Sequence, residues 1–183
     1  MTLGRSAHDN AVSMITQFEP LDDEQDQHRQ DVVAYLRTHA DALHRDCRPD
    51  HVTASALVLS KDGQRVLLDL HRKVRMWLQF GGHVEATDGD LAETALREAR
   101  EESGIAQLSL WSPQPVRIDV HPAPCGARNH LDVQFVAWCD PDLDPSPSAE
   151  SHDVRWFDTD ALPHPTDAAV EALVATGVRC LAQ

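Results

Sequence analysis

Three glutamates at helical spacing are the side chains of this sequence best placed to do chemistry. On a helix, Glu98, Glu101 and Glu102 fall within an arc of roughly 100°, and like charges that close repel one another. A hard divalent cation bound by oxygen ligands, Mg²⁺ or Mn²⁺, is the natural compensation. Arg97, four residues before Glu101, can offset part of the repulsion. The alternative is a solvated helix face, which is what most Arg/Glu runs are.

The residues around these glutamates carry the signals that begin and end a helix. Asp90 and Glu93 have the spacing of a capping box, and Gly104 stands where a left-handed residue ends a helix. The sequence therefore predicts a helix over residues 91–103. Its mostly small residues share one side, so the helix is expected to lie close to a sheet: Ala92, Ala95, Leu96, Ala99 and Ser103.

The whole stretch 81–105 resembles the Nudix box, G-x5-E-x7-R-E-U-x-E-E-x-G-U, where U is aliphatic. Gly82 matches the first glycine, and residues 97–105, REAREESGI, match the second half. The first glutamate of the box has no direct counterpart. Either Asp88 or Asp90 replaces it, and the loop before the helix carries one extra residue. The segments WLQFGGHVE, DVHPAPC and HLDVQF resemble a bacterial Nudix subgroup with a helical N-terminal extension.

This resemblance implies an Mg²⁺- or Mn²⁺-dependent hydrolase in which water attacks phosphorus in the diphosphate linkage of a nucleoside diphosphate derivative or related small molecule. The metal ligands it implies are Glu98, Glu101, Glu102 and the carbonyl of Gly81. The catalytic residues it implies are Glu98 and Glu101, Arg97, which would orient a box glutamate, and Glu150, which is a further candidate for the general base.

Two other functions stay open at this point. One is a Nudix-like module that senses a nucleotide without cleaving it; such modules usually lack box glutamates, whereas all three are present here. The other is an activity like that of isopentenyl diphosphate isomerases, whose Cys-Gly-His segment is replaced here by Gly81, Gly82 and His83.

Basic and histidine side chains near the box are expected to contact substrate phosphate. Arg72 and Lys73 belong to a basic cluster just ahead of the glycines; the alternative is a hairpin edge protected by charge. His83 either touches substrate or packs in its loop. His130 is expected to reach substrate phosphate from a later loop.

Four possible metal ligands of another kind follow one another within twelve residues: His121, Cys125, His130 and Asp132. Their spacing matches no zinc pattern, and the alternation of side chains along a strand would turn some of them apart. A loop over the active site is the simpler interpretation, with a second metal site as the alternative.

The composition sets limits on partners and location. The formal charge of −14 argues against binding a nucleic-acid duplex, but it permits a small phosphorylated substrate because metal ions bridge anionic groups. No apolar run approaches the ~20 residues that cross a bilayer, and residues 1–20 lack the apolar core of a signal peptide. The four cysteines are widely spaced and are expected to be reduced thiols in the cytoplasm.

The expected fold is an α+β, α-β-α sandwich: a mixed sheet flanked by helices, as the Nudix resemblance implies. Residues 51–183 would form the Nudix domain and residues 1–50 a helical extension. An amphipathic helix from Leu21 to about Asp46 would pack on the domain or on a second subunit in a homodimer. The remaining pattern predicts strands at 52–60, 65–69, 108–111, 116–121 and 131–139, a short strand ending at Phe157, and a helix over 167–181.

Overall fold

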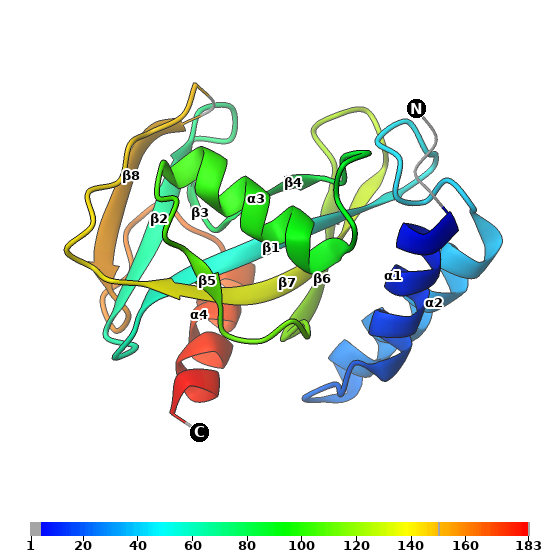
Figure 1. Ribbon diagram of the computed structural model, residues 1–183, viewed down its shortest axis with the longest axis horizontal. Helices are drawn as coiled ribbons and strands as arrows, with labels where there is room; N and C mark the ends of the chain where they lie inside the picture. The colour runs from blue at the N-terminus through cyan, green and yellow to red at the C-terminus, as the bar shows by residue number, and fades with distance from the viewer. Residues whose placement is uncertain (1–4, 150, 183) are drawn as a thin grey trace.

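A mixed sheet of eight strands forms the centre of the protein in this computed structural model, which describes residues 5–149 and 151–182 (Figure 1). The main path runs β3-β2-β1-β7-β5, while β4 pairs with β1, β6 with β7 and β8 with β2. The strands are β1 (His51–Ser60), β2 (Arg65–His71), β3 (Trp77–Leu78), β4 (Phe80–His83), β5 (Ser109–Leu110), β6 (Arg117–Pro122), β7 (Asn129–Cys139) and β8 (Ser151–Asp158).

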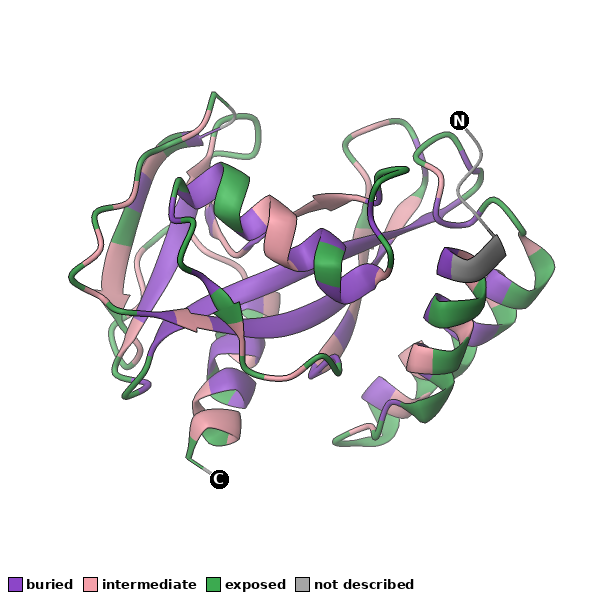
Figure 2. Ribbon diagram, in the orientation of Figure 1, coloured by how far each residue is buried: buried purple, intermediate pink, exposed green. Residues whose placement is uncertain are grey.

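The parallel pair of β1 and β7 is the buried middle of this sheet. Its register runs without a break from His51 beside His130 to Ser60 beside Cys139. Every residue of β1 is buried, which explains its continuous run of apolar and small residues (Figure 2). The other pairings in the sheet are antiparallel, and the turn at Gly63, with φ 69°, joins β1 to β2.

Helices cover both faces of the sheet. Ala54, Ala56 and Val58 of β1 belong to the same apolar cluster as Ala95 and Ala99 of helix α3 (Leu91–Ser103). The intervening residues Leu57 and Leu59 instead pack with Leu173 and Val174 of helix α4 (Ala168–Leu181). Since side chains alternate along a strand, the two helices lie on opposite faces, and the expected α-β-α sandwich is confirmed.

Helix α3 begins and ends as the sequence predicts. Asp90 has extended backbone and its side chain accepts from the N–H of Glu93, while Gly104 closes the helix in the left-handed conformation with φ 71°. The side chain of Glu93 accepts from the N–H of Gly89 at 2.8 Å, so the second half of the capping box is displaced by one residue. The small residues Ala92, Ala95 and Ala99 are buried against the sheet.

Two helices at the N-terminal end, α1 (Arg5–Gln17) and α2 (Asp23–Thr38), pack on each other beside strand β6 (Figure 1). The buried side chain of Gln25 donates to the carbonyl of Ile118 at 3.0 Å and accepts from its N–H at 2.8 Å. This amide therefore pairs with the free edge of β6 as a strand would. The division of the chain at residue 50 stays a prediction, as does a homodimer through this extension.

Two details differ from the sequence expectations. Helix α2 ends at Thr38 rather than near Asp46, because His39 turns to extended backbone and turns follow it; the apolar pattern continued only because Ala42 and Leu43 are also buried. The two box glycines, where no strand was predicted, lie in β4 and pair with β1. No helix in the described ranges has the length and apolar character needed to cross a membrane.

Candidate active site

The guanidinium of Arg97 gathers the carboxylates of the box. Its Nε and Nη2 atoms donate to the two oxygens of Asp88, each at 2.9 Å, and Nη2 also donates to the carbonyl of His83 at 3.0 Å. Its Nη1 atom lies 3.1 Å from Oε1 of Glu98 and 3.2 Å from Oε2 of Glu101. The side chain of Arg97 thus fixes the preceding loop against helix α3 and contacts two of the box glutamates.

Asp88 occupies the place of the missing first glutamate. Besides Arg97, its carboxylate accepts from the N–H of Glu85 and the hydroxyl of Thr94, both at 2.9 Å. Burial alone would raise the pKa of Asp88, but these hydrogen bonds outweigh it and hold the pKa below its usual value. Asp90, the other candidate, is the N-cap of α3. The loop with one extra residue therefore still delivers a carboxylate to Arg97.

The two glycines let strand β4 approach its neighbours closely. A Cβ on Gly81 would lie 2.4 Å from Cβ of Ser55, and a Cβ on Gly82 would lie 2.5 Å from Oε1 of Glu98. The N–H of Gly81 donates to Oε2 of Glu102 at 3.0 Å. The backbone of Gly81 thus lies beside Glu102, and the role of its carbonyl as a metal ligand stays a prediction.

The three glutamates, called the box carboxylates below, differ in exposure. The side chain of Glu98 is 16% exposed and that of Glu101 is 60% exposed, while Glu102 is buried. Burial raises the pKa of Glu98; Arg97 opposes the rise, and the nearby charges of Glu101 and Glu85 add to it. All three are hard oxygen donors, the kind of ligand that suits Mg²⁺ or Mn²⁺, and Glu101 is the one most open to solvent.

Arg72 and Lys73 lie exposed in the turn between β2 and β3. Arg72 donates to the carbonyl of Ser151 at 3.2 Å, which anchors this turn to the start of β8. Neither side chain forms an ion pair with an acid elsewhere in residues 5–149 and 151–182. Their role in binding substrate stays a prediction. Glu150, the further candidate for the general base, lies outside the described residues.

His83 and His130, both expected to bind substrate, lie together on the face of the sheet away from α3, and their role in binding substrate stays a prediction. His83 and His130 join His51 and Cys125 in a group of side chains that we call the His/Cys cluster. Burial, with smaller contributions from neighbouring positive groups, lowers the pKa of His83 to about 4 and that of His130 to about 3, so both rings are neutral at pH 7.

The other two members of the expected His-Cys-His-Asp group have different partners. Nδ1 of His121 pairs with Asp119 at 2.8 Å. Asp132 accepts hydrogen bonds from the hydroxyls of Thr53 and Ser55 at 2.9 and 2.6 Å. The group offered as the alternative metal site is thus divided: Cys125 and His130 lie with His51 and His83, although the ring of His121 also packs against that of His130 at 5.3 Å between centroids. The sequence interpretation missed His51 altogether, because no local motif marks that residue.

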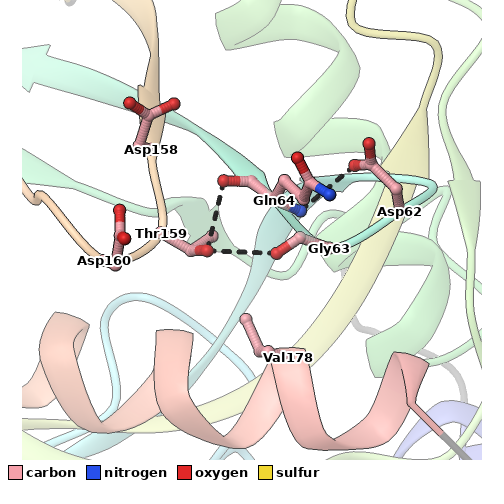
Figure 3. A pocket seen from close by; sticks show the side chains of 7 residues that line it. All are labelled: Asp62, Gly63, Gln64, Asp158, Thr159, Asp160 and Val178. Carbon is pink, nitrogen blue, oxygen red and sulfur yellow. Dashed lines mark hydrogen bonds between the residues drawn. The ribbon is translucent and has the colours of Figure 1, made fainter.

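A shallow hollow elsewhere on the surface contains none of these groups. It lies between the β1–β2 turn and the end of β8, above helix α4, where the hydroxyl of Thr159 bonds to the carbonyls of Gly63 and Gln64 (Figure 3). Its lining carries Asp62, Asp158 and Asp160 and no basic side chain, so it offers nothing to a phosphate. This hollow is therefore not a candidate for the phosphate site.

Comparison with known proteins decides the family. The family model of the NUDIX domain matches residues 49–175, most of the chain. The protein belongs to the Nudix hydrolase family. The match begins two residues before β1 and ends within α4, so it includes the box and every member of the His/Cys cluster.

Solved structures share the fold at low sequence identity. A NUDIX-family hydrolase from Clostridium perfringens is 24% identical with a TM-score of 0.59, over 72% of this chain and 96% of that one. An Ap4A hydrolase from C. elegans is 21% identical with a TM-score of 0.61, over 72% and 97%. The dihydroneopterin triphosphate pyrophosphohydrolase of E. coli is 22% identical with a TM-score of 0.57, over 72% and 96%. The sequence has no significant match among curated proteins.

Proposed function

We propose that this Nudix protein is a Mg²⁺- or Mn²⁺-dependent hydrolase that cleaves a diphosphate linkage in a nucleotide-like small molecule by attack of water on phosphorus. The observation that carries the proposal is the placement of the box carboxylates: Nη1 of Arg97 lies within 3.2 Å of both Glu98 and Glu101, and Glu102 lies against the Gly81 N–H. These oxygen donors fit a hard divalent cation. The proximity of these oxygen donors supports the proposed metal site.

When bound, the cation neutralises diphosphate oxygens and lowers the pKa of a water molecule. The residues of the chain then have separate tasks. Glu98, Glu101 and Glu102 would hold the metal with the carbonyl of Gly81, while Arg97 keeps Glu98 and Glu101 oriented from one side. Asp88 in turn fixes Arg97. One box glutamate, or Glu150, would take the proton from the attacking water.

The substrate is proposed only as a class. Ap4A and dihydroneopterin triphosphate are the compounds named for two structural relatives, and both contain phosphoanhydride linkages. Basic side chains at the β2–β3 turn, Arg72 and Lys73, are exposed and would contact the phosphates. The negative total charge of the chain favours a small substrate carrying its own metal ions over a nucleic-acid duplex.

The test is phosphate release from a panel of diphosphate compounds, including Ap4A, dihydroneopterin triphosphate, ADP-ribose and coenzyme A, with Mg²⁺ or Mn²⁺ and a coupling phosphatase where needed. We expect the wild type to turn over at least one compound and Glu101→Gln to lose about 100-fold or more of that rate. The matched control is Glu93→Gln, on the same helix but bonded to the N–H of Gly89.

Two results would contradict the proposal. Equal rates for Glu101→Gln and the wild type would show that the carboxylate of Glu101 takes no part in the reaction. Tight, metal-dependent binding of a panel compound with no turnover would identify a nucleotide-sensing module instead.

A further inference from the structure

Nitrogen and sulphur atoms of four side chains meet on the sheet face away from helix α3. The Nε2 atoms of His51 and His83 lie 3.1 Å apart. The Sγ atom of Cys125 lies 3.5 Å from Nε2 of His51 and 3.2 Å from Nε2 of His130. All four possible ligand atoms lie within 4.8 Å of one another. They form one compact group rather than a string of contacts.

The strand register explains why the three rings meet. His51 begins β1 and lies beside His130 of β7, and Thr53 of β1 lies beside His83 at the end of β4. Residues paired across strands point to the same face, and so do residues two apart on one strand. The rings of His51, His83 and His130 therefore share a face, and the sheet itself holds them together. No ligand is needed to create this arrangement.

Cys125 reaches the rings from the turn between β6 and β7. The N–H of Arg128 donates to the carbonyl of Pro49 at 2.7 Å, which ties this turn to the chain just before β1. Arg128 and Asp50 add a salt bridge of 2.8 Å at the same place. The thiol is thus brought to the rings by backbone and side-chain bonds that do not involve the cluster.

The spacing of the ligand atoms matches a tetrahedral zinc site. Zinc binds histidine nitrogen at about 2.0–2.1 Å and thiolate sulphur at about 2.3 Å, so ligand atoms at tetrahedral angles lie about 3.3 Å apart for two nitrogens and about 3.6 Å apart for nitrogen and sulphur. The three short distances here are 3.1, 3.2 and 3.5 Å. The remaining pairs lie within 4.8 Å, so side-chain rotations that bring these atoms up to about 1 Å closer would complete the tetrahedron.

We infer that the His/Cys cluster is a structural Zn²⁺ site with three histidine ligands and one cysteine ligand. Four protein ligands fill a tetrahedron, and a closed site of this kind is structural. Binding would release the thiol proton of Cys125, and three neutral rings, one thiolate and Zn²⁺ leave one positive charge at the site. The site would join the start of β1, the end of β4 and the β6–β7 turn.

The cluster and the box select different metals. Soft thiolate and imidazole ligands prefer Zn²⁺ and similar ions, whereas the box carboxylates suit Mg²⁺ or Mn²⁺. The alternative to a metal is a hydrogen-bonded cluster, in which the thiol donates to His130 and one of the two rings at 3.1 Å donates to the other. The two alternatives differ in how the protein responds to added metal.

Cobalt separates these alternatives, because its absorption reports both geometry and sulphur ligation. The full-length protein is freed of metal with a chelator and titrated with Co²⁺ in excess Mg²⁺. We expect visible bands of tetrahedral cobalt and a near-ultraviolet thiolate-to-cobalt band that both saturate at one equivalent. One equivalent of Zn²⁺ should then remove them. If both bands were absent in the wild type, the four side chains would form a hydrogen-bonded cluster that binds no metal, and the inference would be overturned.

Variants test the ligands one by one. Cys125→Ser should lose the near-ultraviolet band and bind Zn²⁺ at least about 100-fold more weakly, since even substitutions outside the ligand shell cost 10–100-fold. His130→Gln should weaken Zn²⁺ binding as much. The controls are Cys180→Ser, a free cysteine of α4, and His152→Gln, an exposed histidine of β8. Both should bind cobalt as the wild type does.

X-ray absorption of the zinc-loaded wild type identifies the ligand atoms directly, so the inference can be tested even if a variant does not fold. We expect one sulphur at about 2.3 Å and three nitrogens at about 2.0–2.1 Å. A shell of oxygen alone would place the zinc on carboxylates and overturn the inference. A near-ultraviolet band that persists in a folded Cys125→Ser protein would do the same.

Discussion

Two groups of possible metal ligands lie back to back in this protein, and adjacent residues of β4 separate them. Gly82 faces helix α3, where a Cβ would meet Glu98. His83, the next residue, turns to the other face and lies 3.1 Å from His51. Carboxylates therefore gather on one face and imidazoles with a thiol on the other. Two sites of opposite chemical character can share one short strand because its side chains alternate.

The two groups differ in how the protein stabilises them without a metal. The box carboxylates are negative, and they are held by the charge of Arg97 and by the N–H of Gly81. The His/Cys cluster is made of neutral rings and a thiol, placed by strand pairing and by a turn. A charged group thus needs a dedicated counter-ion, whereas a neutral one needs only backbone geometry. Substitutions that affect one group should spare the other.

Among substitutions outside the three box glutamates, the largest expected effect on the rate comes from Gly82→Ala. The new Cβ would lie 2.5 Å from Oε1 of Glu98, so this flexible carboxylate must move while the backbone stays. A shift of about 1 Å at a catalytic group can cost about 100-fold in rate, and we expect a loss of 10- to 100-fold in kcat, measured by phosphate release. The midpoint of urea unfolding should change little, and the cobalt spectrum of the His/Cys cluster should not change.

Gly81→Ala is the matched comparison on the same strand. Its Cβ would lie 2.4 Å from Cβ of Ser55 and 2.9 Å from the carbonyl oxygen of Ala54, which are parts of β1 that cannot swing away. This variant should lose stability rather than only activity. If both glycine variants lost stability equally, Gly82 would be a packing residue and the contrast between the faces would be wrong.

A smaller effect is expected from Asp88→Asn, which removes the anion that fixes Arg97. Hydrogen bonds to charged groups contribute about 1.5–3 kcal/mol, and we expect the free energy of unfolding at pH 7 to fall by about that much. Because the folded-state pKa of Asp88 is held below its usual value, its stabilisation is present above the unfolded pKa of about 3.9 and is lost as pH falls through the lower folded pKa.

Chemical denaturation at several pH values from 7 down to 3 tests whether the stabilisation by Asp88 is lost as the pH falls. The wild type and Asp88→Asn should differ most at neutral pH, and their unfolding curves should converge as the solution becomes acidic. A control, Asp160→Asn, removes an exposed carboxylate just after β8, far from Arg97 along the chain. A difference that stayed constant down to pH 3 would show that the charge of Asp88 does not carry the effect.

The sequence predicted the acidic group well because its members are neighbours along the chain. Glu98, Glu101 and Glu102 lie on one helix, whose first and last residues follow from Asp90 and Gly104. The choice between Asp88 and Asp90 could not be made from spacing, because it depends on how a loop with one extra residue folds back on Arg97. Strand β4 was missed because its two glycines are typical of a turn.

The His/Cys cluster could not be assembled from the sequence, since its ligands come from four separate segments. His51 and His83 are 32 residues apart, and 74 residues separate His51 from Cys125. Strand alternation did not separate His121, His130 and Asp132, which share one face of the sheet. His121 pairs with Asp119 instead, and Asp132 accepts hydrogen bonds from Thr53 and Ser55. Which residues replace His121 and Asp132 depends on the parallel pairing of β1 with β7 and on the position of β4. Long-range register, not local pattern, creates this site.

The smallest expected effect concerns the basic turn between β2 and β3, for which we proposed a role in binding the phosphates of a substrate at the box. Lys73 is exposed and has no acidic partner in the described ranges, so its charge is available for a substrate phosphate. An exposed charge contributes up to about 1 kcal/mol, so Lys73→Ala should raise KM by up to about fivefold, leave kcat unchanged and lose this effect at high salt.

The control Arg37→Ala removes another exposed charge from α2, at the other end of the molecule, and should leave KM unchanged (Figure 1). A fall in kcat with constant KM would place Lys73 in the chemical step. If neither kcat nor KM changed, the turn would be only a charged edge of the sheet.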